Sequence, residues 1–421
     1  MPTGRRSVMV LAAAAAVPIA LAGAGKAAAA GSVFAGARAV AASAGVWGTA
    51  TSIPGTNRFP QVQGSGWITS VSCAEPGDCS AGGAYPDSHG YSHAFVANEV
   101  NGTWHTAVNI VGTGLAKGYP TSVNSVSCAK PGDCSAGGYY QDSAGNDQAF
   151  VANEVNGTWH TAIEVPGTAA LNASRNASVN SVSCASPGNC TAGGHYGDLH
   201  SKQQAFVANE VNGTWHTATE VPGTAALNQG GAADVASVSC GSAGSCSAGG
   251  HYSDVYGQWQ AFVANEVSGT WHTAIEVPGT AALNQGDYGS VTSMSCTSPG
   301  NCSAGGHYSS GSFPRAFVAN EVNGTWHIAI AVPGTGTSNS NVYSVSCASA
   351  GNCSAGGYSG LGQAFVVNEV NGTWPALIDV SGIPAASAVD SVSCAAAGEC
   401  SAGGTYSLPG GYGRAFVVSS S

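Results

Sequence analysis

Charged side chains are scarce in this chain of 421 residues. Only 8% of the residues are charged, and Lys and Arg together number 11, against 22 Asp and Glu. Binding to phosphate backbones needs clustered Lys and Arg, whereas the basic residues here are scattered singly. The composition therefore argues against a nucleic-acid partner and predicts a surface that is mostly neutral and polar.

Sequence motifs for several kinds of chemistry are also missing. The sequence offers no nucleophile motif, no phosphate-binding loop and no metal-ligand cluster. We therefore expect no cofactor and no metal. The same absences favour a binding protein over an enzyme.

The N-terminus has the three-part layout of a secretory signal peptide. Arg5 and Arg6 precede an apolar run from Val8 to Ala22, and small residues follow at 27–30. The run is rich in Ala and interrupted by Pro18, which argues against a membrane anchor. We expect residues 1–30 to be removed during Sec or twin-arginine export, which changes the net charge from −11 to −14. Residues 31–44 are then expected to form a disordered linker.

The 14 cysteines occur in pairs whose members are six positions apart. Structural zinc sites usually need four ligands at closer spacing, and each repeat offers only two thiols. In an exported chain such pairs are typical of disulfides, each of which stabilises by about 2 kcal/mol for a loop of this length. The predicted pairs are Cys73 with Cys79, Cys128 with Cys134, Cys184 with Cys190, Cys240 with Cys246, Cys296 with Cys302, Cys347 with Cys353 and Cys394 with Cys400.

The cysteine pairs mark a repeat of 47 to 56 residues, which is the length of a propeller blade. In the repeat 181–222, two short strands flank the turn 185–189, a third strand spans 205–211, and Asn212-Gly213 is a type I′ hairpin signal before a fourth strand. The sequence predicts an all-β, seven-bladed β-propeller with four antiparallel strands and one disulfide per blade. The expected blades are 68–111, 123–166, 179–222, 235–278, 291–333, 342–384 and 389–419.

The two ends of the chain predict how the ring closes. The seventh repeat stops after its third strand. Residues 45–56 resemble the fourth strand of a blade, but no first, second or third strand precedes them. We expect residues 45–56 to form the outer strand of blade 7, so that the propeller spans 45–421 and has no exposed sheet edge at this point.

The Cys, Ala-Gly-Gly and Asn-Gly-Thr-Trp signature, as in Cys128, 136–138 and 156–159, resembles the secreted β-propeller repeat arrays of actinobacteria. Asn101-Gly102-Thr103-Trp104 is also loosely similar to the Asp-box of sialidases, although the acidic residue, Glu99, is spaced differently. A sialidase needs an arginine cluster, which no motif here provides. The second resemblance therefore implies fold and not activity.

Eight of the 11 histidines recur at equivalent positions, after the blade Trp or after Gly-Gly. Residues that repeat around a ring do not converge on one point, as a catalytic centre requires. We interpret His195, His251 and His307, with the five that follow Trp, as scaffold residues.

Function is expected on the rim whose loops differ between blades. This rim holds the loops between second and third strands and the blade-to-blade connections. Its non-repeating residues are Asp87, His89, Tyr91, His93, Lys117, Tyr119, Asp142, Asp147, Arg175, Asp198, His200, Lys202, Asp254, Tyr256, Trp259, Asp287, Tyr288, Phe313, Arg315, Tyr343, Tyr412 and Arg414. The candidate ligand-binding residues among them are His89, Tyr91, His93, Tyr119, His200, Tyr256, Trp259, Tyr288, Phe313, Arg315, Tyr343 and Tyr412.

Three functional hypotheses remain open. The first is a secreted, monomeric, non-catalytic module that binds a polysaccharide or cell-surface glycan through aromatic side chains of the variable loops. The second is an extracellular carbohydrate-active enzyme, either a lyase with a His/Tyr acid–base pair or a hydrolase with two carboxylates. The third is a protein-binding scaffold or inhibitor. Solvated loop residues without a function would produce the same pattern.

Overall fold

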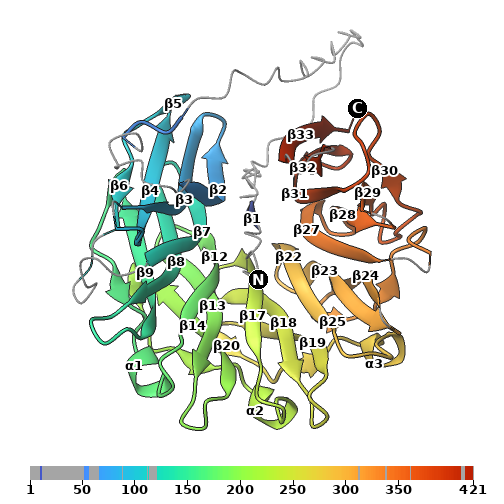
Figure 1. The fold of residues 1–421 in the computed structure, drawn as a ribbon, viewed down its shortest axis with the longest axis horizontal. Helices are drawn as coiled ribbons and strands as arrows, with labels where there is room; N and C mark the ends of the chain where they lie inside the picture. Colours follow the sequence, from blue (N-terminus) through green and yellow to red (C-terminus); the bar gives the residue numbers. More distant parts are fainter. Residues whose placement is uncertain are drawn as a thin grey trace, which may run out of the picture.

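Seven antiparallel sheets are arranged around a common centre in a computed structural model of the chain (Figure 1). The structure describes residues 10–11, 52–55, 66–87, 89–110, 112, 121–311, 313–336, 339–360, 362–408 and 413–420. The chain is an all-β, seven-bladed propeller, as predicted. All seven predicted disulfides are present within their blades.

The first four blades follow one plan. Blade 1 comprises β2 (Trp67–Glu75), β3 (Asp78–Pro86), β4 (Ser92–Val100), β5 (Thr103–Trp104) and β6 (Val108–Asn109). Blade 2 comprises β7 (Thr121–Lys130), β8 (Asp133–Gln141), β9 (Asp147–Val155), β10 (Thr158–Trp159) and β11 (Ile163–Glu164). Blade 3 comprises β12 (Ser178–Ser186), β13 (Asn189–Gly197), β14 (Gln203–Val211), β15 (Thr214–Trp215) and β16 (Thr219–Glu220). Blade 4 comprises β17 (Asp234–Ser242), β18 (Ser245–Ser253), β19 (Trp259–Val267), β20 (Thr270–Trp271) and β21 (Ile275–Glu276).

Blade 5 follows the same plan, whereas blades 6 and 7 have fewer strands among the described residues. Blade 5 comprises β22 (Ser290–Ser298), β23 (Asn301–Ser310), β24 (Phe313–Val322), β25 (Thr325–Trp326) and β26 (Ile330–Ala331). Blade 6 comprises β27 (Ser340–Ser349), β28 (Asn352–Ser359), β29 (Gln363–Asn368) and β30 (Ile378–Asp379). Blade 7 comprises β31 (Ser387–Ala396), β32 (Glu399–Ser407) and β33 (Gly413–Ser419). One-turn helices α1 (Thr168–Leu171), α2 (Thr224–Leu227) and α3 (Thr280–Leu283) follow the outer strands of blades 2 to 4.

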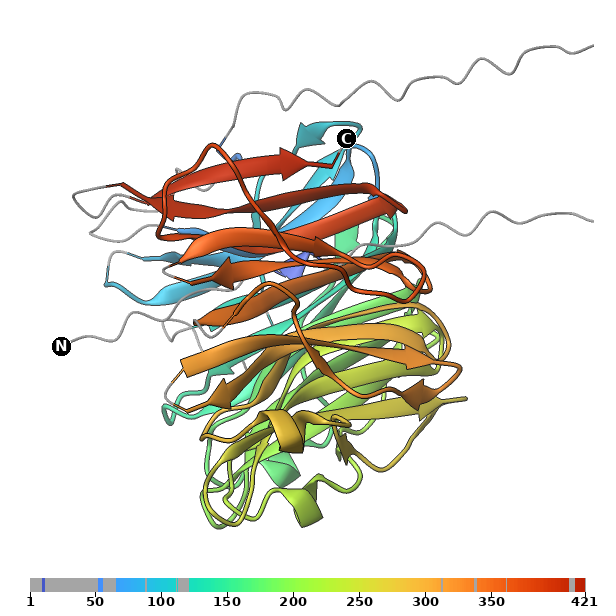
Figure 2. The ribbon, with the colours of Figure 1, turned by 90° about the vertical axis from the view of Figure 1, so that its right-hand side faces the viewer.

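In blades 1 to 5 the fourth strand is split into two short pieces, both paired with the third strand. The first strand of every blade is the innermost (Figure 1), and the strands run from one rim of the ring to the other (Figure 2). The predicted Asn-Gly hairpin turn is present, because Asn212 and Gly213 have φ values of 50° and 80°.

The two glycines of the Gly-Gly pair lie where no side chain fits, the first against the next blade and the second against the inner strand of its own blade. A Cβ atom on Gly193 would lie 2.5 Å from Val235 Cγ1 of the next blade, and one on Gly194 would lie 1.9 Å from the carbonyl oxygen of Ser178. The apolar core therefore lies between blades, and Phe206 at its centre is fully buried.

A polar network also joins successive blades. Trp215 Nε1 and Asn153 Nδ2 illustrate it: the indole donates to Asn153 Oδ1 at 2.8 Å, and the amide donates to Glu210 Oε1. Equivalent bonds link Asn98 with Glu154, Asn209 with Glu266, Asn265 with Glu321 and Asn320 with Glu369. Burial raises the pKa of Glu154 to about 7, against the hydrogen bond from Asn98.

The boundary between blades 7 and 1 differs from the other six in the described part of the chain. A Cβ atom on Gly403 of blade 7 would meet only its own blade, at 3.8 Å or more. The strand β1 (Val10–Leu11) pairs in parallel with β2 and also contacts β31. The predicted closing strand, 45–56, lies outside the described residues except for 52–55.

The four described residues of that segment occupy a repeat position. The Ala107 amide donates to the Pro54 carbonyl at 2.8 Å, just as the Ala218 amide donates to the Pro166 carbonyl at 2.7 Å. Pro166 belongs to the outer connection of the blade that precedes Ala218. Pro54 thus lies where the outer connection of a blade before blade 1 would lie.

Candidate functional site

The two rims predicted from the chain direction are separate surfaces. On one rim, here called the short-turn rim, the two hairpin turns of each blade contact each other, as where the Gly213 amide donates to the Gly188 carbonyl at 2.8 Å. On the other, here called the variable rim, each blade connection contacts the next second-to-third loop, as where the Ser174 amide donates to the Gly197 carbonyl at 2.9 Å.

Four aspartates of the variable rim repeat, and the interpretation of them as non-repeating is wrong. Asp87, Asp142, Asp198 and Asp254 each accept hydrogen bonds from the backbone amides two and four residues later. The side chain six residues later bonds the second carboxylate oxygen, and is a His in blade 1 and a Gln in blades 2 to 4. These aspartates therefore stabilise the loops.

In blade 1, this arrangement includes one predicted ligand-binding residue, His93. Its Nε2 lies 3.0 Å from Asp87 Oδ2, and its ring stacks on Tyr85. The bond from His93 lowers the pKa of Asp87 to about 2. His89 and Tyr91 are exposed on the same loop, and both donate their backbone amides to Asp87.

The remaining predicted ligand-binding residues that the structure describes lie in blades 3 to 6 and their connections. His200 and Tyr256 are exposed at loop tips, Phe313 is exposed at the start of β24, and Arg315 donates to the Gly336 carbonyl at 3.1 Å. Tyr343 lies within the inner strand β27, with its ring 5.6 Å from that of Tyr358. Tyr119 and Tyr412 lie outside the described residues.

Two of the predicted residues, Trp259 and Tyr288, contact each other in a cluster at blade 4. Their rings meet edge to face at a centroid distance of 5.8 Å, although Tyr288 belongs to the connection to blade 5. The ring of His251 also stacks on Trp259, at a centroid distance of 4.0 Å. Trp259 is half-buried and Tyr288 is exposed, so the pair forms a partly exposed aromatic surface.

The carboxylate of Asp234 lies next to His251 of this cluster. His251 Nδ1 lies 3.1 Å from Asp234 Oδ1 on the inner strand β17. Burial alone would raise the pKa of Asp234, but His251 outweighs it and holds this pKa below its usual value. An aspartate in this position fixes the orientation of the imidazole ring and leaves Nε2 as its available nitrogen.

The neighbouring blades place two more histidines beside this pair. His195 of blade 3 adds to the stabilisation of the Asp234 carboxylate. Burial lowers the pKa of His307 of blade 5 to about 4, with a smaller contribution from His251. Among the described residues, no group of His, Cys, Asp and Glu could hold a metal ion.

The repetition of His251 predicts a scaffold role for it, and Asp234 is not among the residues predicted from the sequence. The available signal was that Asp234 stands where blades 3 and 5 have Ser178 and Ser290, each paired in the sheet with the corresponding histidine. The histidine repeats in blades 3 to 5, but the carboxylate beside it occurs only in blade 4 of these, so the pair is specific to one blade. The cluster of Asp234, His251, Trp259 and Tyr288, here called the rim cluster, is therefore the candidate site.

Comparisons with known proteins show a similarity of fold alone. No family model matches the chain, and no curated protein matches it. Among solved structures, a polysaccharide lyase of family PL25, an ulvan lyase, is 10% identical with a TM-score of 0.50, covering 87% of this chain and 93% of the lyase. Sqt1 from Chaetomium thermophilum is 13% identical with a TM-score of 0.49, covering 82% of this chain and 80% of Sqt1. Both identities are low, and the similarity is that of the fold.

The disulfides are typical of an extracellular or other oxidising environment. Within the described residues, no helix is long and apolar enough to span a membrane.

Proposed function

We propose that this protein is exported and binds a neutral glycan at the rim cluster. The observation that carries the proposal is the contact between Trp259 and Tyr288, which presents two aromatic side chains at one place on the variable rim. Aromatic rings pack against the C–H faces of sugars, while polar groups beside them bond hydroxyls. Asp234 and His251 supply such groups here.

Binding of the secreted chain to a panel of neutral and acidic polysaccharides tests the proposal. We expect Trp259→Ala and Tyr288→Ala each to weaken binding at least about tenfold, because an anchoring aromatic contributes more than 1.4 kcal/mol. Tyr91→Ala is the matched control, since Tyr91 is an exposed aromatic of the same rim that lies three blades away from the cluster. Equal losses for all three variants would contradict the assignment of the site.

A carbohydrate-active enzyme is the second candidate, and the His251–Asp234 pair favours it. An imidazole held by a carboxylate is a suitable acid–base group. Assays for unsaturated products and for reducing ends separate the two functions. Turnover that disappears in His251→Gln and Asp234→Asn while polysaccharide binding persists would establish catalysis. If the chain instead binds a protein and no glycan, and the rim variants abolish that binding, the function is that of a protein-binding scaffold.

A further inference from the structure

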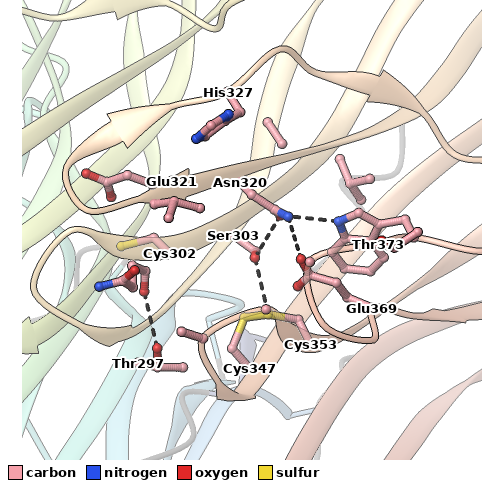
Figure 3. A pocket seen from close by; sticks show the side chains of 18 of the residues that line it. Thr297, Cys302, Ser303, Asn320, Glu321, His327, Cys347, Cys353, Glu369 and Thr373 are labelled. Carbon is pink, nitrogen blue, oxygen red and sulfur yellow. Dashed lines mark hydrogen bonds between the residues drawn. A yellow bond between two sulfur atoms is a disulfide. The ribbon is translucent and has the colours of Figure 1, made fainter.

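A second site lies on the opposite, short-turn rim. A pocket of about 580 Å³ opens between blades 5 and 6 (Figure 3), which is within the range of small-molecule sites. Smaller pockets of about 240 and 230 Å³ occupy equivalent places between blades 1 and 2 and between blades 3 and 4. The large pocket is therefore an enlarged version of a repeated feature.

A buried carboxyl group lines the pocket with one oxygen unused. Glu369 is only 3% exposed, and its Oε1 accepts a hydrogen bond from Asn320 Nδ2, whereas its Oε2 has no hydrogen-bond partner. Glu154 and Glu266, which line the two smaller pockets, likewise have an Oε2 without a partner, whereas Ser247 donates to Glu321 Oε2 at 3.2 Å at the boundary between blades 4 and 5. A buried acceptor without a partner is costly, so a ligand that donates a hydrogen bond there would be stabilised.

The sequence departs from the repeat at the boundary that holds the largest of these three pockets. Ile328 replaces the Thr that follows the Trp-His pair in blades 1 to 4, and Pro375 replaces that His in blade 6. In blade 6 the third strand ends at Asn368, and Glu369 lies beyond it. These departures distinguish the boundary between blades 5 and 6 from the others, and Ile328 adds an apolar side chain to the pocket lining.

The pocket wall combines apolar and amide side chains. Ile328, Ile330 and Trp374 contribute apolar surface, while Asn320 and Asn371 contribute amides. Burial raises the pKa of Glu369, which disfavours its charged form. The lining thus favours a neutral ligand that has both an apolar face and hydroxyl groups.

We propose that the pocket between blades 5 and 6 binds one neutral pyranose unit, with a sugar hydroxyl donating to Glu369 Oε2. The C–H face of the ring would pack against the apolar wall, and further hydroxyls would bond the two amides. This site is independent of the rim cluster, because its residues lie on the opposite rim.

Saturation-transfer NMR on the exported chain tests the proposal, with methyl α-D-glucopyranoside, methyl α-D-galactopyranoside, methyl α-D-mannopyranoside and tetramethylammonium as probes. We expect transfer to at least one pyranoside. Glu369→Gln replaces the acceptor with an amide donor and should weaken binding at least about tenfold. Glu266→Gln, the same change at the small pocket between blades 3 and 4, should leave the affinity within about twofold.

A second pair of variants covers the case in which Glu369→Gln does not fold. Ala350 is exposed at the lip of the pocket, so Ala350→Trp should block it without disturbing the core, and Ala243→Trp makes the same change between blades 3 and 4. No transfer to any pyranoside, stronger transfer to tetramethylammonium, or equal losses in both members of a pair would overturn the proposal. Loss of pyranoside binding in Trp259→Ala with retention in Ala350→Trp would also overturn it, while leaving the rim cluster supported.

Discussion

Trp215 of blade 3 and Asn153 of blade 2 are 62 positions apart in the chain, and the indole Nε1 donates to the asparagine Oδ1 at 2.8 Å. The same bond recurs at four other boundaries, with lengths from 2.9 to 3.3 Å. Each blade is thus attached to its predecessor through the outer part of the sheet as well as through the apolar core.

Removal of this bond has a measurable cost. Trp215→Phe keeps most of the aromatic packing and leaves Asn153 Oδ1 with one donor fewer, so we expect a loss of about 1 kcal/mol, or about 2 °C in the melting temperature for a chain of this size. Trp104→Phe is the control, because blade 7 has Ser419 in place of the asparagine. A control that loses as much stability as Trp215→Phe would show that the packing, and not the bond, is responsible.

The buried glutamates predict unusual behaviour with pH. The pKa of Glu154 is raised to about 7 in the folded chain, so its protonated form is favoured by folding. Its contribution to stability is complete below about pH 4.5 and is lost as the pH rises through 7. The lowered pKa of Asp87, about 2, acts in the opposite sense and removes stability as the pH falls below about 4.

We therefore expect the melting temperature to be highest between about pH 4 and pH 5 and to decrease by several degrees toward pH 8. Circular dichroism at a series of pH values measures this. Glu154→Gln should flatten the decrease, since the amide does not titrate, whereas Glu99→Gln at the boundary with blade 7 should not. A melting temperature that increases from pH 5 to pH 8 in the unmodified chain would contradict the prediction.

The glycine at the blade boundary offers a third test. Gly193→Ala places a methyl group 2.5 Å from Val235 Cγ1, and we expect overpacking to cost about 1–3 kcal/mol. Val235→Ala removes the shortest contact of this methyl group, while Val238 Cγ1 remains 2.7 Å from it. In a double-mutant cycle the two losses should therefore be less than additive, and strict additivity in urea denaturation would contradict the contact.

Ring closure remains a prediction, and truncation tests it. Deletion of 45–56 should lower the melting temperature far more than deletion of 31–44, because only the former segment resembles the missing outer strand of blade 7. The bond between the Ala107 amide and the Pro54 carbonyl supports this expectation. Two truncated chains with equal melting temperatures would refute it.

Much of the fold could be predicted from local signals. Cysteine spacing, Asn-Gly turns and Gly-Gly pairs are each interpreted within one repeat, and the structure confirms the strands and disulfides that they predict. Contacts between repeats could not be predicted in this way. The sequence shows that Asn153, Glu210 and Trp215 recur, but nothing local indicates that the asparagine of one blade bonds the other two residues in the next.

The candidate site shows the same limit. Trp259 and Tyr288 do not repeat, which predicts a functional role, whereas the repetition of His251 predicts a scaffold role. Its pairing with Asp234 depends on the strand register, which places the start of β17 opposite the residue after Gly-Gly. The pocket beside Glu369 has no clear sequence signal either, because it lies between two blades and is lined by residues of both.

The direction of the boundary contacts has a consequence for how such a chain can change length. Every boundary described from blade 1 to blade 6 joins an asparagine of one blade to a glutamate and a tryptophan of the next, so each of these blades presents the same leading and trailing surface. A blade inserted or removed by duplication or deletion of one repeat of 56 residues, such as the span from Cys184 to Cys240, would meet complementary neighbours on both sides. The number of blades is then limited by the geometry of closing the ring and not by the chemistry of the interfaces.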